Sequence, residues 1–330
     1  MAEKEGVILS GMRPTGKLHL GHLVGALDNW VSLQDNYKCY FLVADLHVLT
    51  TGFEDSAEIP EFTFEMVLDW LAVGLDPERS TFLVQSQVKQ HSELNLIFSM
   101  ITPMPWVERN PTIKEMISDL GLTGKIHFGL MGYPILQAAD ILLYRADLVP
   151  VGEDQVAHVE MTREIARRFN FLYNPVFPEP KAKLSPTPRL PGTDGKKMSK
   201  SLGNCIYISD ENDTVGAKVH KMITDPQKVR KGDPGRPEVC SVYAYHEIFN
   251  QAQTDKIAAG CRSGELGCVP CKQMLASTIG TRLEPLRQRR RSYADNPEKV
   301  HEILSEGSRM AAKKAAETMD MVYEAMGMKF

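Results

Sequence analysis

Two pairs of side chains in this 330-residue sequence are suited to stabilising negative charge on a phosphate. His19 and His22 lie in PTGKLHLGH, where a Pro–Gly turn predicts a loop leading into a helix whose first N–H groups face a phosphate. Three positions apart, the imidazoles share one helix face. Lys197 and Lys200 lie in GKKMSKSLGN, a glycine-flanked loop whose ammonium groups suit a polyphosphate leaving group. Each pair alone is also typical of ordinary surface residues, but together they indicate a nucleotide site.

Four of the six cysteines form a second group, at positions 240, 261, 268 and 271, with the spacing C-x20-C-x6-C-x2-C. In a reducing compartment such a group binds metal more often than it forms disulfides. Four thiolates with one close pair predict a Cys₄ zinc site or a [4Fe–4S] cluster, and the loose spacing favours the cluster, whose ligands bind separate corners. Four unlinked thiols are the remaining alternative. Cys39 is expected in the core, and Cys205 is assigned no role.

The elements that must position these residues alternate in type through the first half of the chain. Short apolar runs predict buried strands at residues 7–12, 39–50, 81–86 and 147–152. Amphipathic stretches predict helices at residues 19–34, 59–75, 92–101, 135–144 and 153–170. This alternation predicts an α/β fold with a doubly wound, mainly parallel sheet of Rossmann type. Ligands of such sheets bind at the carboxyl ends of the strands, where the histidine pair is expected.

The second half changes character after a proline-dense segment, residues 175–191, which is incompatible with a regular helix or a central strand and predicts a connector. It leads into an exposed, mobile lysine loop. Helices are then predicted at residues 213–224, 244–260, 271–294 and 311–328. We therefore expect a Rossmann-type catalytic domain over residues 1–204 and a helical domain over residues 205–330.

Charge and hydropathy limit the classes of protein that this chain can be. The net charge of −4 argues against indiscriminate nucleic-acid binding, but not against a local cationic patch. Residues 228–236 and 286–292 are basic, and form either such a patch or solvated helix faces. No apolar run is long enough for a signal peptide or a membrane span, so a cytoplasmic protein without membrane partners is expected.

The two phosphate motifs also carry a resemblance. HLGH followed by KMSKS resembles the signature pair of class I aminoacyl-tRNA synthetases. Over nearly the whole chain, GMRPTGKLHLGHLVGAL, YPILQAADILLY, VPVGEDQVAHVEMTREIARRFN and LPGTDGKKMSKS are similar to tryptophanyl-tRNA synthetases. Many bacterial members have Thr and Asn in place of His19 and His22. The resemblance implies that the chain activates L-tryptophan with ATP to tryptophanyl-adenylate and pyrophosphate, with Mg²⁺ on the phosphates. It then implies transfer to the 3′ end of tRNA(Trp), by a homodimer with a helical anticodon-binding domain.

The resemblance assigns roles to individual residues. His19, His22, Lys197 and Lys200 are the implied catalytic contacts with the phosphates. The further implied ATP contacts are Arg13, Thr15, Gly21, Gly152, Asp154, Met198 and Ser199. The cysteine spacing is close to a motif that binds [4Fe–4S] in some bacterial family members. This implies Cys240, Cys261, Cys268 and Cys271 as ligands, and we expect the flanking Arg262 and Lys272 to contact tRNA.

The amino acid to be activated is indicated by one carboxylate. Tyr133, Gln137 and Asp140 have spacings that place them on one helix face. An indole N–H is only a donor, so its pocket needs a buried acceptor, and the resemblance makes Asp140 that acceptor. The remaining implied pocket residues are Leu9, Gly11, His47, Val149, Val151 and Gln155. Gln137 departs from relatives that carry Met.

Other functions stay open at the level of these residues. A carboxylate also accepts from a phenol, so Asp140 alone does not separate this chain from a tyrosyl-tRNA synthetase. The whole-chain resemblance favours tryptophan. A catalytically silent RNA-binding relative and a small-molecule nucleotidylyltransferase are further alternatives, and the intact HLGH, GEDQ and KMSKS segments argue against the silent one.

Overall fold

A five-stranded parallel sheet forms the centre of the computed structural model, which describes residues 4–119, 121, 126–184, 190–230 and 232–329. The strands are β1 (Val7–Met12), β2 (Lys38–Val43), β3 (Ser80–Val84), β4 (Leu148–Val151) and β5 (Lys181–Leu184). Their order is β3-β2-β1-β4-β5, which places β1 in the middle with β2 and β4 as its parallel neighbours. The predicted α/β, doubly wound fold is confirmed.

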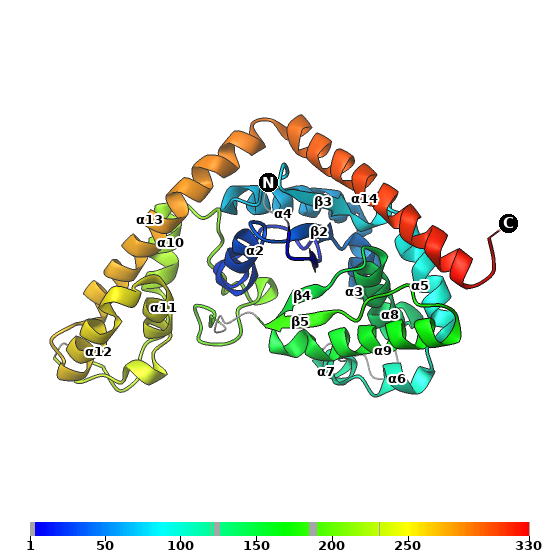
Figure 1. The fold of residues 1–330 in the computed structure, drawn as a ribbon. Coiled ribbons are helices and arrows are strands. Elements are labelled where there is room, and N and C mark those ends of the chain that lie inside the picture. The colour runs from blue at the N-terminus through cyan, green and yellow to red at the C-terminus, as the bar shows by residue number, and fades with distance from the viewer. Residues whose placement is uncertain (1–3, 120, 122–125, 185–189, 231, 330) are drawn as a thin grey trace.

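Helices cover both faces of this sheet (Figure 1). The α-helices that follow strands in the first half are α2 (Asp28–Leu33), α3 (Asp45–Gly52), α4 (Ile59–Val73), α5 (Gln90–Ile101), α6 (Met104–Glu108), α7 (Pro111–Asp119), α8 (Phe128–Leu143) and α9 (Val156–Leu172). Side chains alternate across β1, so Ile8 joins the core beneath α2 and α4, whereas Leu9 joins the core beneath α5, α8 and α9. Burial on both faces explains why β2 and β3 are almost continuously apolar.

The second predicted strand is wrong in its latter half. β2 ends at Val43, and α3 begins at Asp45. The Asp45 carboxylate accepts the N–H groups of Leu46 and Ser86 at 3.0 Å each, and the Gln85 side-chain oxygen accepts from Leu46 at 3.2 Å. These acceptors satisfy donors at the start of the helix and let the chain turn away from the sheet.

The predicted helix at residues 19–34 is interrupted. It consists of α1 (Leu20–His22), a π-helical segment η1 (Leu23–Leu27) and α2. π-bulges widen a helix locally and are frequent at functional sites. Gly25 and Ala26 of this segment line the cavity described below.

The proline-dense connector contains a strand that the sequence analysis did not predict. β5 begins directly after Pro180 and pairs with β4 only. An edge strand needs hydrogen bonds on one side alone, so a proline directly before it is tolerated.

The second half is helical, with boundaries that differ from the prediction. Its α-helices are α10 (Asn212–His220), α11 (Ser241–Phe249), α12 (Thr254–Ser263), α13 (Cys268–Ala294) and α14 (Pro297–Ala325). The short helical turns of the chain are η2 (Phe53–Glu58), η3 (Gln85–Gln87), η4 (Glu153–Gln155), η5 (Lys200–Leu202), η6 (Pro237–Val239) and η7 (Gln251–Gln253). The predicted helix over 244–260 is split by η7. α14 starts 14 residues before the predicted 311, because the Asn296 side chain caps it and Pro297 occupies its first turn.

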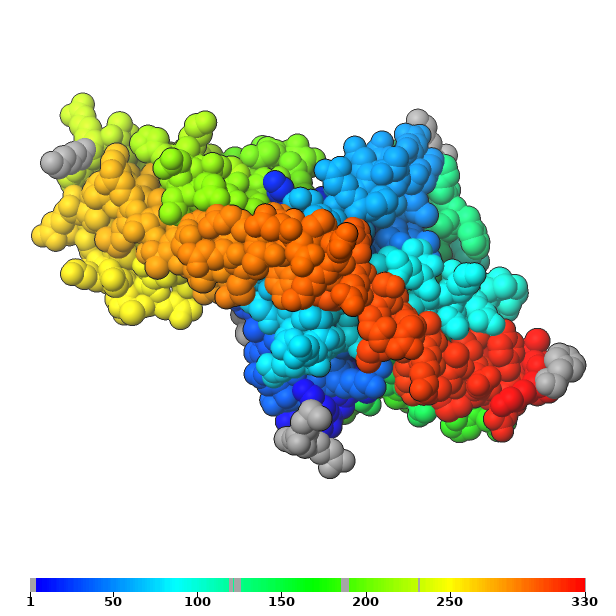
Figure 2. Space-filling view, turned by 90° about the horizontal axis from the view of Figure 1, so that it is seen from above, coloured from blue at the N-terminus to red at the C-terminus, as the bar shows by residue number. Residues whose placement is uncertain are grey.

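α13 and α14 form an arch over the sheet, and from above they run as one ridge across the molecule (Figures 1 and 2). α14 lies directly on β3, where Gly307 approaches the Phe82 carbonyl so closely that a Cβ atom would stand 1.9 Å from its oxygen. The Ser308 hydroxyl accepts the Val84 N–H at 3.0 Å. The last helix therefore packs on the first half of the chain. In the described part of the chain, no helix is long and apolar enough to cross a membrane.

Basic residues 286–292 attach α13 to the sheet-bearing half instead of forming a free cationic face. Arg290 pairs with Asp69 at 2.7 Å and with Glu65 at 2.5 Å, and Arg289 donates to the Ala72 carbonyl at 2.7 Å. Arg287 is buried and donates to the Asp210 carbonyl at 2.8 Å. These arginines are therefore occupied by α4 and the segment before α10.

Candidate active site

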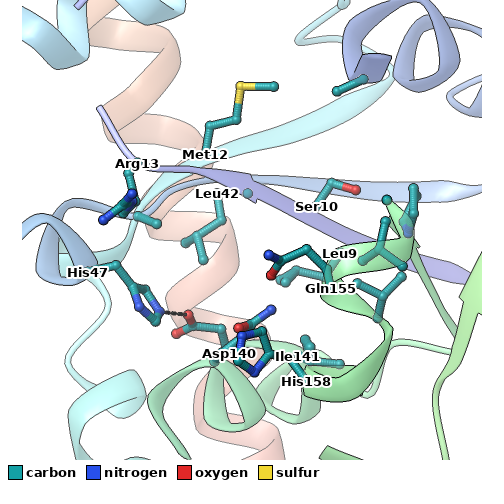
Figure 3. Close-up of a pocket in the computed structure, with 18 of the residues that line it drawn as sticks. Leu9, Ser10, Met12, Arg13, Leu42, His47, Asp140, Ile141, Gln155 and His158 are labelled. Carbon is teal, nitrogen blue, oxygen red and sulfur yellow. Dashed lines mark hydrogen bonds and ion pairs between the residues drawn. The ribbon is translucent and has the colours of Figure 1, made fainter. Parts of the chain in front are cut away.

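A cavity of about 360 Å³ opens at the carboxyl ends of β1 and β4 (Figure 3). Its walls come from β1, η1, α3, α8, β4 and the start of α9. The lining includes every residue predicted for the amino-acid pocket: Leu9, Gly11, His47, Tyr133, Gln137, Asp140, Val149, Val151 and Gln155. Strands and helices distant in sequence therefore bring this set together, as the fold of a parallel sheet predicts.

Asp140 is the buried carboxylate of this cavity, and three donors surround it. His47 Nε2 lies 2.8 Å from Oδ2, while Gln85 Nε2 and His91 Nδ1 lie 2.7 and 2.6 Å from Oδ1. Burial acts to raise the pKa of Asp140, but the hydrogen bonds and charges of His47 and His91 outweigh it and lower the pKa to about 2. Asp140 is therefore ionised and offers only acceptors.

Tyr133 has a fixed orientation through a second histidine. Asn110 accepts the Thr112 N–H through its amide oxygen at 3.1 Å, so its amide nitrogen donates to His158 Nδ1 at 3.1 Å. Burial lowers the pKa of His158 to about 4, so the ring is neutral and carries its proton on Nε2. That N–H donates to the Tyr133 hydroxyl at 2.9 Å. The hydroxyl proton of Tyr133 is left for a group in the cavity.

The two histidines of HLGH lie beside each other at the start of α1. Their ring centroids are 3.8 Å apart, and His22 Nδ1 accepts the His19 backbone N–H at 3.2 Å. Burial first, and then the charge of Lys200, lowers the pKa of His19 to about 4; burial, His19 and Lys200 lower that of His22 to about 3. The buried Nδ1 atom of His19 has no hydrogen-bond partner among the described residues. Both rings are neutral, and at least one buried nitrogen lacks a partner.

The lysine loop packs against this turn. Ile206 accepts the Leu20 N–H, and Leu18 accepts the Ile208 N–H, each at 2.9 Å, so the two distant motifs share a short ladder. Lys200 donates to the Thr15 carbonyl at 2.8 Å, to the Thr15 hydroxyl at 3.0 Å and to the Gly16 carbonyl at 3.1 Å. Burial lowers its pKa to about 8. Lys200 is therefore docked beside HLGH.

Other members of the loop differ in exposure. Lys197 is exposed, whereas Met198 is buried with its sulfur against Gly21, where a Cβ would stand 3.5 Å away. The buried Asn204 organises the loop: its oxygen accepts the Ser199 N–H at 2.8 Å, and its amide donates to the Lys197 carbonyl at 3.1 Å. The loop thus presents one lysine to solvent and holds the other against the turn.

The HLGH turn is also held by a buried ion pair between α4 and α13. Asp69 of α4 is buried and accepts the Leu18 N–H at 2.7 Å, with Arg290 of α13 on its other oxygen. Burial raises the pKa of Asp69, and the charge of Arg290 opposes that rise. Through Arg290 and Asp69, the long helix α13 is connected to the residue that precedes His19.

The predicted adenosine contacts lie at the end of β4. Gly152 lines the cavity, and a Cβ there would come within 2.8 Å of the Asp154 carboxylate, so only glycine allows that carboxylate to approach. Arg13 also lines the cavity, contacts the Thr51 hydroxyl at 3.4 Å, and has its pKa lowered by burial. The remaining predicted ATP residues lie at the HLGH turn and the lysine loop, outside the described lining of this cavity.

The four clustered cysteines lie at the far end of α13. Cys240 precedes α11, Cys261 lies in α12, and Cys268 and Cys271 begin α13, all as free thiols. Burial, followed by repulsion from the other three thiols, raises the pKa of Cys271 to about 12, so the four lie within electrostatic reach of one another. Among the described residues, no three His, Cys, Asp or Glu side chains are grouped closely enough to hold a metal ion. The predicted metal or cluster is not confirmed.

The two residues predicted to contact tRNA have different surroundings. Arg262 is exposed and lies 3.8 Å from Glu238. Lys272 donates to the carbonyls of His220 and Met222 at 2.8 and 2.7 Å, which ties α13 to the end of α10. Arg262 is therefore free to meet a ligand at little cost, whereas Lys272 already has partners.

Comparison with known proteins agrees with this geometry. A family model described as tRNA synthetases class I (W and Y) matches residues 1–284. The chain is 49% identical to the tryptophan–tRNA ligase of Thermotoga maritima, over 98% of this chain and 99% of that protein. It is 44% identical to that of Aquifex aeolicus, over 97% and 99%. This chain belongs to the tryptophanyl-tRNA synthetases of class I. A tryptophanyl-tRNA synthetase from Campylobacter jejuni, solved with ADP and tryptophan, has a TM-score of 0.86 at 31% identity and covers 97% of this chain and 99% of that chain.

Membership of the tryptophanyl-tRNA synthetases confirms the resemblance, the fold class and the assignment as an aminoacyl-tRNA ligase. It favours tryptophan over the tyrosine alternative. Several residues that shape the site of this synthetase were not predicted from sequence: Gln85, His91, His158, Asn110, Asn204 and Asp69. Each of these residues is polar and buried, and polar residues are rarely buried without a partner. The sequence signals this only for Asp69, which is a charged residue inside an apolar run.

Proposed function

We propose that this tryptophan–tRNA ligase forms tryptophanyl-adenylate and pyrophosphate from L-tryptophan and ATP, and then transfers tryptophan to the 3′ end of tRNA(Trp). The observation that carries the proposal is the position of Asp140. An ionised carboxylate lies in a largely apolar cavity at the strand ends. An indole N–H matches it because that group donates and cannot accept. An amino acid without a donor at this position would leave one acceptor position of the buried carboxylate unfilled, which is costly.

The phosphate end supplies charge stabilisation for the first step. The amino-acid carboxylate attacks the α-phosphorus in line, and no protein nucleophile is needed because positioning and electrostatics lower the barrier. We assign His19, His22, Lys197 and Lys200 to the phosphates. The unpartnered nitrogen of His19 and the docked Lys200 support this assignment. Mg²⁺ would bind the nucleotide phosphates and neutralise part of their charge.

The adenosine is assigned to the end of β4 and to the loops around it. Gly152 leaves room for Asp154, whose carboxylate is suited to accept from ribose hydroxyls. Arg13, Thr15, Gly21, Met198 and Ser199 complete the proposed ATP contacts. In the second step the acyl group moves from the adenylate to the terminal adenosine of tRNA, and AMP leaves.

Amino-acid-dependent ATP–pyrophosphate exchange tests this function. Exchange is expected with tryptophan in the absence of tRNA, together with charging of tRNA(Trp). Exchange with tyrosine and not with tryptophan would instead support the tyrosyl alternative. No exchange with either would support a catalytically silent RNA-binding protein. Exchange that is unaffected by any tRNA, without charging, would support a small-molecule nucleotidylyltransferase.

The four cysteines are proposed ligands of a [4Fe–4S] cluster, with zinc as the alternative. The support is a set of four free thiols from three elements, within electrostatic reach of one another, with the predicted spacing. The thiol donors suit either group chemically. The cluster would hold η6, α12 and the start of α13 together. This chain's own residues would then present Arg262 and Lys272 toward the anticodon arm.

Anaerobic purification, an absorption spectrum and iron, sulfide and zinc analysis on one sample test the cysteine proposal. Matching iron and sulfide would support the cluster, and one zinc per chain would support the alternative. Absence of both would leave four structural thiols. Replacing Arg262 should weaken charging of tRNA while sparing pyrophosphate exchange; equal loss of both activities would contradict its assignment.

Assembly and domain division are further proposals. We propose a cytoplasmic homodimer, with the exposed apolar side chains Leu96 and Met100 of α5, Met104 of α6 and Phe128 of α8, each more than half exposed, as candidates for its interface. Light scattering of the purified protein tests this. The division into residues 1–204 and 205–330 stays a prediction. The packing of α14 on β3 favours counting that helix with the catalytic unit.

A further inference from the structure

The Asp140 carboxylate has an incomplete set of hydrogen bonds. A carboxylate offers about four acceptor positions on its two oxygens. Gln85 and His91 occupy both positions of Oδ1, at 2.7 and 2.6 Å. His47 occupies one position of Oδ2, at 2.8 Å, and it lies on the cavity side in Figure 3. One acceptor position therefore remains on Oδ2, the oxygen whose partner His47 lines the cavity.

His91 can make its contacts in one neutral form. The ring is fully buried, with Nδ1 beside Asp140 Oδ1 and Nε2 at 2.8 Å from the Tyr144 hydroxyl. Because an ionised carboxylate only accepts, Nδ1 must carry the proton and donate. In a neutral ring Nε2 then accepts, so the Tyr144 O–H donates to it. Asp140 thus fixes the proton on Nδ1, and the Tyr144 hydroxyl is the partner that holds Nε2 and with it the orientation of the ring.

Neither residue belongs to the described lining of the cavity. Tyr144 is fully buried, and its ring stacks on Tyr40 at a centroid separation of 4.6 Å. Gln85 is fully buried as well. Among the cavity-lining residues, Asp140 is the one that the side chains of Gln85 and His91 hydrogen-bond, so their effect on a ligand is expected mainly through that carboxylate. Buried networks of this kind hold a group in one orientation because every member has a partner.

We propose that Tyr144 and His91 are positioning residues for tryptophan selection: they direct a hydrogen bond onto Oδ1 of Asp140 and so reserve one Oδ2 position for the indole N–H. The inference rests on the proposed function, which assigns tryptophan to this cavity. Without the Tyr144 hydroxyl, the buried Nε2 of His91 loses its partner, the ring is no longer held in place, and its hydrogen bond to Oδ1 weakens. The carboxylate can then rotate or take up a proton, and the acceptor for the indole N–H is no longer fixed.

The test compares tryptophan with β-(3-benzothienyl)alanine, in which sulfur replaces the indole N–H and the shape is kept. ATP–pyrophosphate exchange gives kcat/KM for each amino acid, and their ratio measures the use of the N–H. In the unmodified enzyme the ratio should strongly favour tryptophan. Tyr144→Phe should lower the ratio about tenfold, mainly by raising KM for tryptophan, since a hydrogen bond to a charged group is changed. KM for ATP should stay constant.

His91→Asn is the matched control, because its amide can place a donor near the position of Nδ1 without needing Tyr144. It should retain more of the ratio than His91→Leu, which removes the donor. The double variant Tyr144→Phe/His91→Asn should show no loss beyond that of His91→Asn. Tyr144→Phe removes one oxygen from a stacked ring, so it keeps the test possible if His91→Leu does not fold.

The outcomes separate the inference from the proposed function. A merely structural role would lower kcat/KM for both amino acids alike and leave the ratio unchanged, and that result overturns the inference. Absence of exchange with tryptophan in the unmodified enzyme overturns the proposed function itself. A histidine ¹⁵N spectrum adds an independent readout. It should show His91 with its proton on Nδ1 in the unmodified enzyme and a shifted Nε2 resonance in Tyr144→Phe, where the hydrogen bond to the hydroxyl is lost, and identical spectra would contradict the inference.

Discussion

The two parts of the candidate active site, the cavity at the strand ends and the HLGH turn with the lysine loop, differ in how their polar groups are satisfied. At the amino-acid end, Asp140 already has three donors and Tyr133 is oriented through His158. At the phosphate end, His19 has a buried nitrogen without a described partner, and Lys200 rests on backbone oxygens beside it. The polar groups at the amino-acid end have partners on the protein, whereas the other end keeps a buried imidazole nitrogen that no described residue hydrogen-bonds.

This difference matches the two substrates. Selection of a neutral aromatic side chain depends on one hydrogen bond. An acceptor held in one orientation makes that bond selective, although burying the polar group is itself unfavourable. A polyphosphate changes its charge distribution during the reaction, and its stabilisers act best when they are aimed at the charge that develops. Burial lowers the pKa values of His19 and His22, which keeps both rings neutral, and it lowers the pKa of Lys200, which makes the charged form of that lysine less stable until an anion is present. The phosphate end therefore carries an electrostatic cost that binding of ATP relieves.

The largest expected effect is at the amino-acid end. Asp140→Asn keeps the shape but turns one oxygen into a donor, which faces His47 or the pair on Oδ1. Breaking a buried, charge-assisted network by changing one member costs about 3–5 kcal/mol. We expect a loss of that size in the free energy of unfolding, measured with urea, together with loss of tryptophan-dependent exchange.

Asp154→Asn is the matched control, since it makes the same change at an exposed carboxylate on the rim. It should leave the free energy of unfolding within about 0.5 kcal/mol and raise KM for ATP. If Asp140→Asn were equally harmless to stability, the carboxyl of Asp140 would be protonated in the folded protein. The contrast between the two ends would then be wrong.

The second effect is expected at the phosphate end, where activity should fall without a loss of stability. Lys200→Met removes a cation whose pKa is already lowered by burial, so the fold should be as stable as before or more stable. Pyrophosphate exchange should fall about 10²–10³-fold, as for loss of one preorganised stabiliser. Lys17→Met, at an exposed lysine of the same turn, should change neither property. A Lys200→Met enzyme that is unstable and fully active would reverse the assignment.

A smaller effect is expected where the lysine loop is organised. Asn204→Ala leaves the Ser199 N–H and the Lys197 carbonyl without their partner, a cost of about 1–3 kcal/mol in unfolding free energy. The rate of ATP–pyrophosphate exchange should also fall about tenfold, because the loop no longer holds its lysines in place. Ser201→Ala removes only an exposed contact with the Ser199 hydroxyl and serves as control. Equal behaviour of the two variants would show that Asn204 is not the organiser.

The residues that line the cavity were predicted from the sequence, whereas the buried residues that contact them from outside the cavity were not. Leu9, Asp140 and Gln155 were assigned through resemblance, and β1, β4 and α8 bring them together because parallel strands end at one edge. His47 lines the cavity as predicted, although the apolar run around it predicted a strand. Nothing in that run distinguishes β2 from α3, since the helix starts where Asp45 and Gln85 satisfy its first N–H groups.

Residues behind the lining depend on partners that no local pattern reveals. His91 lies in VKQHSE, where neighbouring polar residues predict a solvated helix, yet it is buried between Asp140 and Tyr144. Gly307 weakens a helical pattern, yet it is the residue that lets α14 lie on Phe82. In each case a contact between segments distant in sequence overrides the local preference. The chemistry of a pocket is therefore more readily predicted than the groups that hold it in place.

The smallest expected effect is a pH dependence confined to the phosphate end. Burial lowers the pKa of Lys200 to about 8, whereas His19 and His22, at about 4 and 3, do not titrate between pH 7 and 9. Because kcat/KM reports groups of the free enzyme, kcat/KM for ATP should fall about tenfold from pH 7 to pH 9 as Lys200 loses its proton. The deprotonation of Lys200 does not lower kcat/KM by unfolding the protein. The folded pKa of Lys200 lies below its unfolded value of about 10.4, so the unfolded chain binds more protons in that window and stability rises with pH. Lys200→Arg keeps the charge and should remove the alkaline decline even if its plateau is lower. A decline that persists in Lys200→Arg would belong to another group and would remove the electrostatic cost assigned to this end.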